Sequence, residues 1–211
     1  MLKLKAFTLA EILITMGIVG VIAALTVPDL VNDYQNKAMA VKIRKSLNDF
    51  ENTIDQYVTA EGKQHFNRTT AATSKDFDTF IKENFRVVRT CDAKTAGCFA
   101  SENYISIDGK ESKEFKCTKK SYILADSSAI CMKPTYTGNS LFLVQVWIDV
   151  NGPAEPNIGG RDMFFFWFIP STDTLLHGAA NSCVTTSNGA GCITKLQELS
   201  LIHISEPTRP L

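Results

Sequence analysis

The stretch FTLAEILITMGIVGVIAALTV, from Phe7 to Val27, decides what kind of molecule this chain can form. Its 21 residues carry a single charge, on Glu11. As an α-helix it would be roughly 32 Å long, enough to cross the hydrocarbon core of a bilayer. It also exceeds the apolar part of an ordinary secretory signal peptide, roughly 7–15 residues. The stretch therefore predicts a membrane-spanning helix.

Beyond this stretch the sequence pattern changes, but the helix is predicted to continue. Pro28 removes a backbone donor and crowds the preceding turn, so we expect a kink there. Between residues 38 and 60 apolar residues recur at helical spacing: Ile43, Leu47, Phe50, Ile54 and Tyr57 or Val58. Charged residues lie between them, which is typical of a helix with one buried stripe. We expect one kinked helix of about 50 residues that ends near Ala60–Lys63.

The rest of the chain predicts mainly β-structure. A short helix and a strand are expected within Ser74–Arg89, and turns at Pro134–Asn139 and Asn151–Gly160. Further strands are predicted at Ser121–Ala125, Leu141–Val150 and Met163–Ile169. Alternate residues of the last strand should face the core, and the others the long helix or a neighbouring molecule. An antiparallel sheet packed on the second half of the helix gives an α+β fold.

Charge and cysteine content narrow the class of protein. Lys and Arg total 22, as do Asp and Glu, so the net charge gives no indication of nucleic-acid binding. A locally basic stretch at 110–120 predicts a solvated surface rather than a DNA contact. All six cysteines lie beyond residue 90, which predicts disulfides in a head exported to an oxidising compartment. Pairing of nearest neighbours gives Cys91–Cys98, Cys117–Cys131 and Cys183–Cys192.

The N-terminal residues resemble the processing motif of type IV pilins and type II secretion pseudopilins. The motif is Leu4-Lys5-Ala6 followed by FTLAEIL. The resemblance implies a leader of residues 1–6, cut by a prepilin peptidase between Ala6 and Phe7, and N-methylation of Phe7. Ala6 replaces the glycine that the family usually has at this position. The resemblance also implies filament-assembly roles for Glu11, Gly20 and Pro28.

The same resemblance implies an organisation and a location for the whole chain. Residues 7–28 would form a transmembrane helix that becomes the filament core, 29–60 its amphipathic continuation, and 61–198 a pilin-like, disulfide-bonded β-rich head. A C-terminal loop such as the one that Cys183–Cys192 would close resembles one found in many pilins. The subunit would sit in the bacterial inner membrane with its head outside, before an assembly machinery polymerises it. A surface pilus, a secretion pseudopilus and a DNA-uptake fibre all remain open.

Glu11 has a physical interpretation that does not need the family. An ionised side chain in a bilayer span costs about 2.5–3.5 kcal/mol at the helix centre, and less near the end. A positive amine on Phe7 of a neighbouring subunit would neutralise it and set the axial register. The alternative is a carboxylate that reaches the headgroups or is protonated in place. Gly17 and Gly20 either permit close helix packing or reflect the frequency of glycine in membrane spans.

The oxygen-rich loop between two predicted strands also has two interpretations. Four of its side chains could supply oxygens to calcium: Asp149, Asn151, Asn157 and Asp162. The pattern does not match an EF-hand. The alternative is a hairpin loop whose Asp and Asn side chains bond to its own backbone.

No catalytic arrangement is predicted, and His65 and His177 are expected to be surface or core residues. We therefore expect a structural subunit rather than an enzyme. The alternative is a single-pass anchored binding protein or enzyme that does not polymerise, or a secreted domain with an ordinary signal peptide. The tail at 199–211 begins with LSLIHISEPTR, which resembles the translation of a transposon-based sequencing adapter. We expect this tail to be no part of the natural fold.

Overall fold

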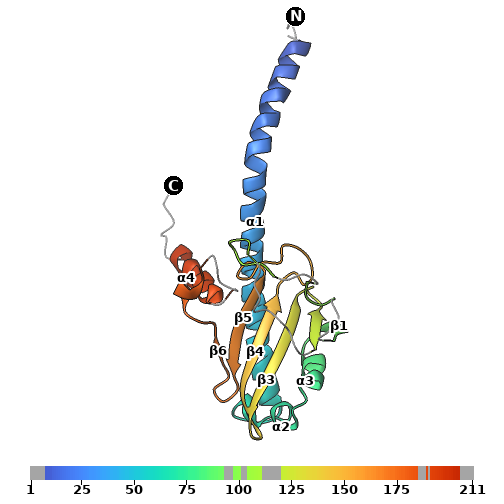
Figure 1. Cartoon of the computed structure of the whole chain (residues 1–211), viewed down its shortest axis with the longest axis vertical. Coiled ribbons are helices and arrows are strands. Elements are labelled where there is room, and N and C mark those ends of the chain that lie inside the picture. Colours follow the sequence, from blue (N-terminus) through green and yellow to red (C-terminus); the bar gives the residue numbers. More distant parts are fainter. Residues whose placement is uncertain are drawn as a thin grey trace, which may run out of the picture. The chain divides into compact units, whose positions relative to one another are not determined.

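The computed structural model describes residues 8–92, 97–100, 104–110, 120–184, 189 and 191–204. The chain divides into two compact units, Met1–Ala38 and Met39–Leu211. Helix α1 (Leu9–Ala60) contributes residues to both (Figure 1). The remaining elements, which belong to the second unit, include a six-stranded sheet with every neighbouring pair antiparallel. The α+β class expected from the sequence is therefore confirmed.

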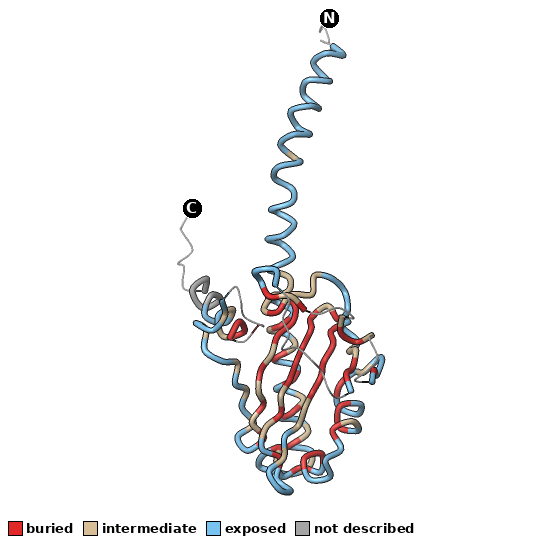
Figure 2. The backbone as a smooth tube through the Cα atoms, in the orientation of Figure 1, coloured by how far each residue is buried: buried red, intermediate tan, exposed pale blue. Residues whose placement is uncertain are grey.

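The two parts of α1 differ in burial. From Leu9 to Lys37 every residue is exposed except Ala23, which is intermediate (Figure 2). Among the described residues, α1 is the one helix long and apolar enough to cross a membrane. Its second part buries the stripe expected from the sequence: Ile43, Leu47, Phe50, Ile54 and Val58. Pro28 lies inside α1 and does not end it.

The end of α1 falls where the sequence predicted it. Gly62 has a φ of 62°, a left-handed conformation that glycine adopts without steric cost. The N–H of Gly62 donates to the carbonyl of Thr59, and the N–H of Lys63 donates to the carbonyl of Val58. This pair of bonds is a Schellman motif, which satisfies carbonyls that the helix itself leaves without partners.

The strands follow one another in the sheet in chain order. They are β1 (Val87–Cys91), β2 (Ser121–Leu124), β3 (Ala129–Thr137), β4 (Ser140–Asp149), β5 (Met163–Ile169) and β6 (Thr174–Leu176). The helical elements around them are η1 (Phe66–Arg68), α2 (Thr70–Ser74), α3 (Phe77–Asn84), η2 (Ala180–Ser182) and α4 (Cys192–Ile204). The strands β2, β4 and β5 and the helix α3 all lie in regions where the sequence predicted them.

The sheet buries apolar side chains on both faces because successive residues of a strand point to opposite sides. On one face Phe164, Phe166 and Phe168 join the main core with the buried stripe of α1. The ring of Phe50 lies 5.6 Å from that of Phe166, centroid to centroid. On the other face a second cluster contains Trp147 and Met163, with Phe165 packed against it. The alternation expected for Met163–Ile169 is thus confirmed. The expectation that the long helix or a neighbouring molecule covers the other residues was wrong for Met163 and Phe165, because the helix packs on the core face and residues of the head itself pack on the opposite face.

One predicted turn was wrong. Pro134 to Thr137 belong to strand β3, and the turn to β4 is only Gly138-Asn139. Proline is tolerated because β2 pairs with β3 only at residues 129–131. Pro134 therefore has a neighbouring strand on one side only, where its missing N–H need not cost a ladder hydrogen bond. Gly138 has a φ of 61°, which suits the tight hairpin turn.

The C-terminal helix was not predicted. α4 begins at Cys192 and continues to Ile204, so residues 199–204, which the sequence analysis excluded from the fold, are helical. Ile193 is buried and Leu196 packs against the main core. Nη2 of Arg44 donates to the carbonyl oxygen of Leu196 over 2.8 Å. Tertiary contacts of residues 192–198 thus support the start of this helix, while the adapter origin of the tail stays a prediction.

Candidate functional site

The first turn of α1 holds the charged residue that the sequence singled out. The Glu11 carboxylate accepts hydrogen bonds from the backbone N–H of Thr8, at 2.8 Å, and from its hydroxyl, at 2.9 Å. The backbone N–H of Glu11 donates to the Thr8 hydroxyl at 3.3 Å. This reciprocal arrangement is a capping box, which satisfies donors at the start of a helix. Ala6 and Phe7, the predicted cleavage and methylation residues, lie outside the described residues.

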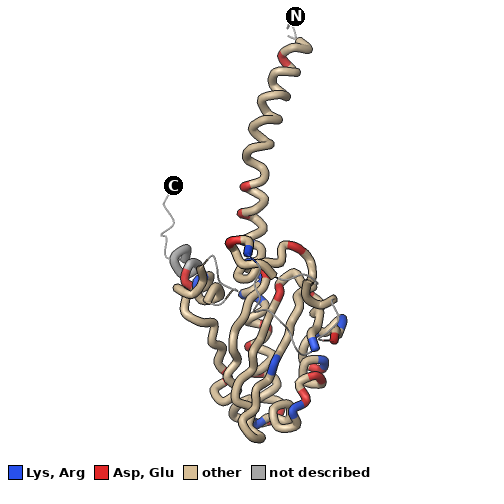
Figure 3. The backbone as a smooth tube through the Cα atoms, viewed as in Figure 1, with Lys and Arg blue, Asp and Glu red and all other residues tan. Residues whose placement is uncertain are grey.

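The stretch that follows Glu11 carries no charge until Asp29 (Figure 3). Its polar side chains are bonded to the helix itself. The Thr15 hydroxyl donates to the carbonyl of Ile12 at 3.0 Å, and that of Thr26 to the carbonyl of Ile22 at 2.9 Å. Internal satisfaction of polar groups is what a helix needs in lipid, where water cannot supply partners. The segment therefore presents an almost wholly apolar exterior with one acid at its start.

The glycines and the proline of this segment lie on open helix surface. A β-carbon placed at Gly17 or Gly20 would meet no atom within 4 Å. Close helix packing at Gly20 therefore stays a prediction about contacts with another molecule. Proline at position 28 leaves the carbonyl of Ala24 without its usual helical partner. The assembly role of Pro28 stays a prediction as well.

Disulfides hold the head together at two places among the described residues. Cys91 is joined to Cys98, and Cys183 to Cys192. Both pairs match the nearest-neighbour pairing expected from the sequence. Cys131 is also disulfide-bonded, but Cys117, its predicted partner, lies outside the described residues. Cys192 is fully buried, and the second bridge ties this buried start of α4 to Cys183, the residue that follows η2.

Two buried acids flank the connection between β4 and β5, Asp149 as the last residue of β4 and Asp162 immediately before β5. Asp149 accepts hydrogen bonds from the Tyr104 hydroxyl and from the backbone N–H of Asn151. Asp162 accepts from the backbone N–H groups of Ile158, at 2.6 Å, and of Met163, at 3.1 Å. Burial raises the pKa of Asp149 to about 7, partly offset by the Tyr104 bond. Burial likewise raises the pKa of Asp162 to about 6.

These contacts bear on the calcium interpretation of the loop. Within the described part of the chain, no three His, Cys, Asp or Glu side chains come together as a metal site would require. Both carboxylates already bond to nearby backbone groups, and the Asn151 amide donates to the carbonyls of Ala154 and Glu155. Three buried oxygens, on Asn151, Asn157 and Asp162, have no hydrogen-bond partner among the described atoms. The hydrogen bonds agree with the local-bonding interpretation, whereas the three oxygens without a partner are of the kind that calcium binds. Calcium at this loop therefore stays a prediction.

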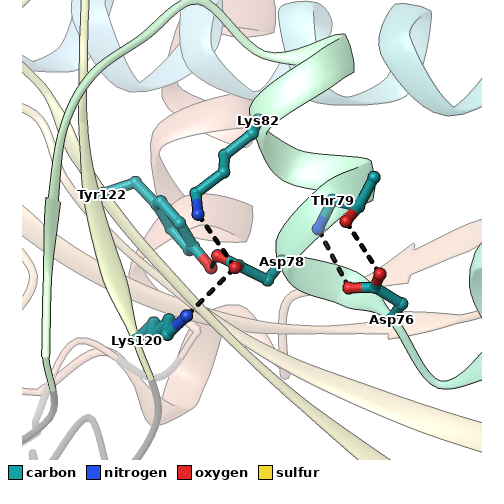
Figure 4. Close-up of polar contacts among 6 residues, drawn as sticks. All are labelled: Asp76, Asp78, Thr79, Lys82, Lys120 and Tyr122. Carbon is teal, nitrogen blue, oxygen red and sulfur yellow. Dashed lines mark hydrogen bonds and ion pairs between the residues drawn. The ribbon is translucent and has the colours of Figure 1, made fainter.

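A cluster of polar side chains around Asp78 of α3 was not predicted from the sequence. Asp78 accepts hydrogen bonds from Lys82 at 2.9 Å, Lys120 at 3.0 Å and the Tyr122 hydroxyl at 2.7 Å (Figure 4). Burial opposes its ionisation, but these three donors outweigh burial and lower the pKa to about 2. Lys120 lies 42 residues from Asp78, so no local pattern marks this contact. The cluster fastens α3 to β2 and offers no nucleophile or base in a cavity.

The neighbouring cap of α3 could have been found from sequence. The Asp76 carboxylate accepts from the backbone N–H of Thr79 at 3.1 Å and from its hydroxyl at 2.7 Å (Figure 4). Asp three residues before Thr, at the start of an apolar-periodic segment, is a recognisable N-cap signal. The side chain of Asp76 is thus occupied in starting the helix.

The two histidines of the head have different surroundings. His65 is partly exposed, and its Nδ1 lies 3.0 Å from a carboxylate oxygen of Asp173. Asp173 also accepts from the backbone N–H of Phe66, so it links η1 to the β5–β6 turn. The ring of His177 packs edge-on against Phe166, and burial lowers the pKa of this imidazole. Both positions agree with the expected surface and core roles.

Comparisons with protein-family models, curated proteins and solved structures each return no match. The case for a function therefore rests on the residues of this chain. The feature that stands out is the first part of α1, whose apolar surface is uncovered within the single molecule.

Proposed function

We propose that this chain is a structural subunit of a type IV pilus or a type II secretion-like pseudopilus, polymerised through its N-terminal helix. One observation carries the proposal. A single helix has an exposed apolar first part and a second part that forms the core of a β-rich head. An anchor needs the first part only. Because α1 continues without a break into the core of the head, a pull on its apolar first part would be passed along the helix to the head.

The chemistry of assembly follows from the first turn. Removal of residues 1–6 would free an amine on Phe7, three residues before Ala10 and four before Glu11. In apolar surroundings an amine and a carboxylate on neighbouring helices neutralise one another, and neither charge then remains without a partner. The Thr8–Glu11 capping box holds the carboxylate at the helix start in the free subunit. An incoming amine would bind a carboxylate that is already oriented.

The proposed location agrees with the chemistry of the head. Two disulfides among the described residues are typical of a domain that matures outside the reducing cytosol. The head would thus lie outside the inner membrane, with the leader in the cytoplasm. The partners would be other pilin subunits, a prepilin peptidase, the assembly machinery and membrane lipid.

The N-terminus of the mature protein tests the proposal most directly. Mass spectrometry of protein from the native host should find N-methyl-phenylalanine at position 7. An uncut Met1 would overturn the processing step and favour a permanent anchor. A cut beyond Val27 would instead indicate an ordinary secreted domain.

Assembly is tested separately with Glu11. The Glu11→Ala variant should insert in the membrane and be processed, but its filament yield should fall by more than about tenfold. Asp33→Ala provides a matched control, because Asp33 is an exposed acid of the same helix that pairs only with Lys37 among the described residues. Normal filaments from Glu11→Ala would contradict the assembly role.

A second candidate, a single-pass anchored protein that never polymerises, has one observation in its favour. The capping box already gives the Glu11 carboxylate two donors within its own chain. A neighbouring amine is therefore not the only way to satisfy it. Cross-linking between cysteines introduced at Val19 and Val21 of different copies would distinguish the two, because a lone anchor yields no ladder of oligomers.

A further inference from the structure

The second half of α1 and the sheet enclose a groove that the proposed function does not use. Its volume is about 620 Å³, within the range of small-molecule sites. The helix supplies one wall, with Lys45, Asp49, Asn52 and Gln56 spaced to share one helix face. The opposite wall is made by Asn84–Arg86, which begin at the last residue of α3, and by 124–126, which run from the end of β2 into the β2–β3 turn. All of these residues belong to the second unit.

The groove carries equal numbers of positive and negative side chains. Lys45 and Arg86 are basic, and Asp49 and Asp126 are acidic. None of the four joins an ion pair with another described residue. Their fields largely cancel, so a phosphate, a nucleic acid or another highly charged ligand gains no net attraction. A ligand without net charge suits the groove better.

The remaining polar groups of the groove are carboxamides. Asn52 and Gln56 are exposed, and their side chains make no hydrogen bond to other described residues. Asn84 uses its amide nitrogen to donate to the carbonyl of Phe80 at 2.9 Å, which leaves its oxygen as an acceptor. A carboxamide offers donors and an acceptor side by side. Hydroxyl groups, each both donor and acceptor, complement such a surface.

A small apolar cavity adjoins this groove. Its volume is about 30 Å³, and it shares Asp49, Phe85, Leu124 and Asp126 with the groove. Core residues Phe50, Ile130 and Ile148 also line it. The space is large enough for one water molecule or one methyl group. Ser46 and Ser128 also line the cavity, but most of the surface that it exposes is apolar, which suits a methyl group better than a water molecule.

The walls argue against the common macromolecular ligands. An added peptide strand needs an unpaired strand edge, but β2 is paired on both sides, with β1 and with β3. A docked helix or a lipid needs a row of apolar anchors, whereas the wall from α1 is polar and the apolar residues of the groove are confined to Phe85, Leu124 and Ala125. We propose that the groove binds a neutral carbohydrate bearing acetamido groups, such as a chain of N-acetylated amino sugars, with one acetamido methyl in the small cavity.

Titration of the full-length protein in detergent micelles tests this proposal. Tri-N-acetylchitotriose should bind saturably at millimolar or lower concentration, followed by calorimetry or by NMR. Cellotriose, which lacks the acetamido groups, should bind at least about tenfold more weakly. The double variant Asn52→Ala/Gln56→Ala should lose about tenfold in affinity, as expected for the loss of several neutral hydrogen bonds. Leu124→Phe, which fills the small cavity, should reduce the preference for the acetylated sugar.

Asn48→Ala is the matched control, because Asn48 is exposed on α1 but does not line the groove. Its affinity should equal that of the unaltered chain. No saturable binding at about 10 mM sugar, equal affinity for cellotriose, or an equal loss in Asn48→Ala would each overturn the proposal. The measurement uses single subunits, so its failure would leave the filament proposal untouched, and a failure to polymerise would leave this one untouched.

Discussion

The two halves of α1 share one backbone but differ in what covers their apolar side chains. In the first half Leu9 is 80% exposed and Leu13 65%. In the second half Ile43 and Phe50 are each 1% exposed. The second half places its apolar residues on one stripe, which a single sheet face can cover. The first half is apolar on all sides, and only lipid or several other helices can cover such a surface.

The strongest test of this difference removes one large side chain from each half. Phe50→Ala should lower the free energy of unfolding of the head by about 3–5 kcal/mol, because Phe50 contacts Phe166 and Phe168 in the core. Val21→Ala, in the exposed half, should leave the free energy of unfolding of the head unchanged. Thermal unfolding in micelles, followed by circular dichroism, measures both. A similar loss in the two variants would mean that the first half also packs on the head.

Removal of the Cys183–Cys192 disulfide measures how much this bridge contributes to the stability of the head. The variant Cys183→Ser/Cys192→Ala should lose about 2–4 kcal/mol of stability, because the bridge no longer restricts the unfolded chain. Release of α4 from the core should add to the loss. The helical signal of the first half should not change in the same samples. Unaltered unfolding of the head would show that α4 is held by packing alone.

The buried acids of the head predict a pH dependence that the uncharged span of α1 cannot have. The pKa of Asp149 is raised to about 7 and that of Asp162 to about 6. Between about pH 4 and pH 7 these two acids hold more protons in the folded head than in the unfolded chain, so they make its stability fall as the pH rises. The lowered pKa of the His177 imidazole opposes this fall. The loss should be about 1–3 kcal/mol, measured from denaturant midpoints across this range.

Asp149→Asn should flatten this pH profile, because an amide cannot ionise but still accepts a hydrogen bond. Asp126→Asn is the control, since Asp126 is exposed and bonds only to Ser128 among the described residues. If the stability of Asp149→Asn depended on pH as steeply as that of the unaltered chain, Asp149 would not be the source of the pH dependence.

The smallest expected effect concerns the start of α1. Thr8→Ala removes the capping box and should destabilise the first helical turn by about 1 kcal/mol. Amide hydrogen exchange at residues 10–12 should become about fivefold faster, while the unfolding of the head stays the same. Thr15→Ala, which removes a hydroxyl bonded within the helix, should not reproduce the change. An equal effect in both would indicate general fraying rather than loss of the cap.

Local sequence patterns were enough to predict several features of the fold. The buried stripe of α1, its end at Ala60 and the alternation of β5 all follow from residue spacing. The two described disulfides follow from the proximity of their cysteines along the chain. In each case the deciding interactions lie within one element or between residues close in sequence, so the sequence displays them directly.

Other features depended on partners far along the chain. Pro134 is acceptable in β3 because β2 stops short of it. The helix α4 packs through Ile193 and Leu196 on a core assembled from distant segments. Asp149 meets Tyr104 across 45 residues, so its burial and its raised pKa could not be read from the loop itself. The groove that we propose to bind sugar likewise exists only once α1 and the sheet have packed.

The sequence by itself determined that one helix has an apolar first half and a striped second half, because helical periodicity translates directly into surfaces. Tertiary structure decided which oxygens are buried, which strands have a free side and where a groove remains. These properties depend on the summed packing of many residues, and no short segment contains that information.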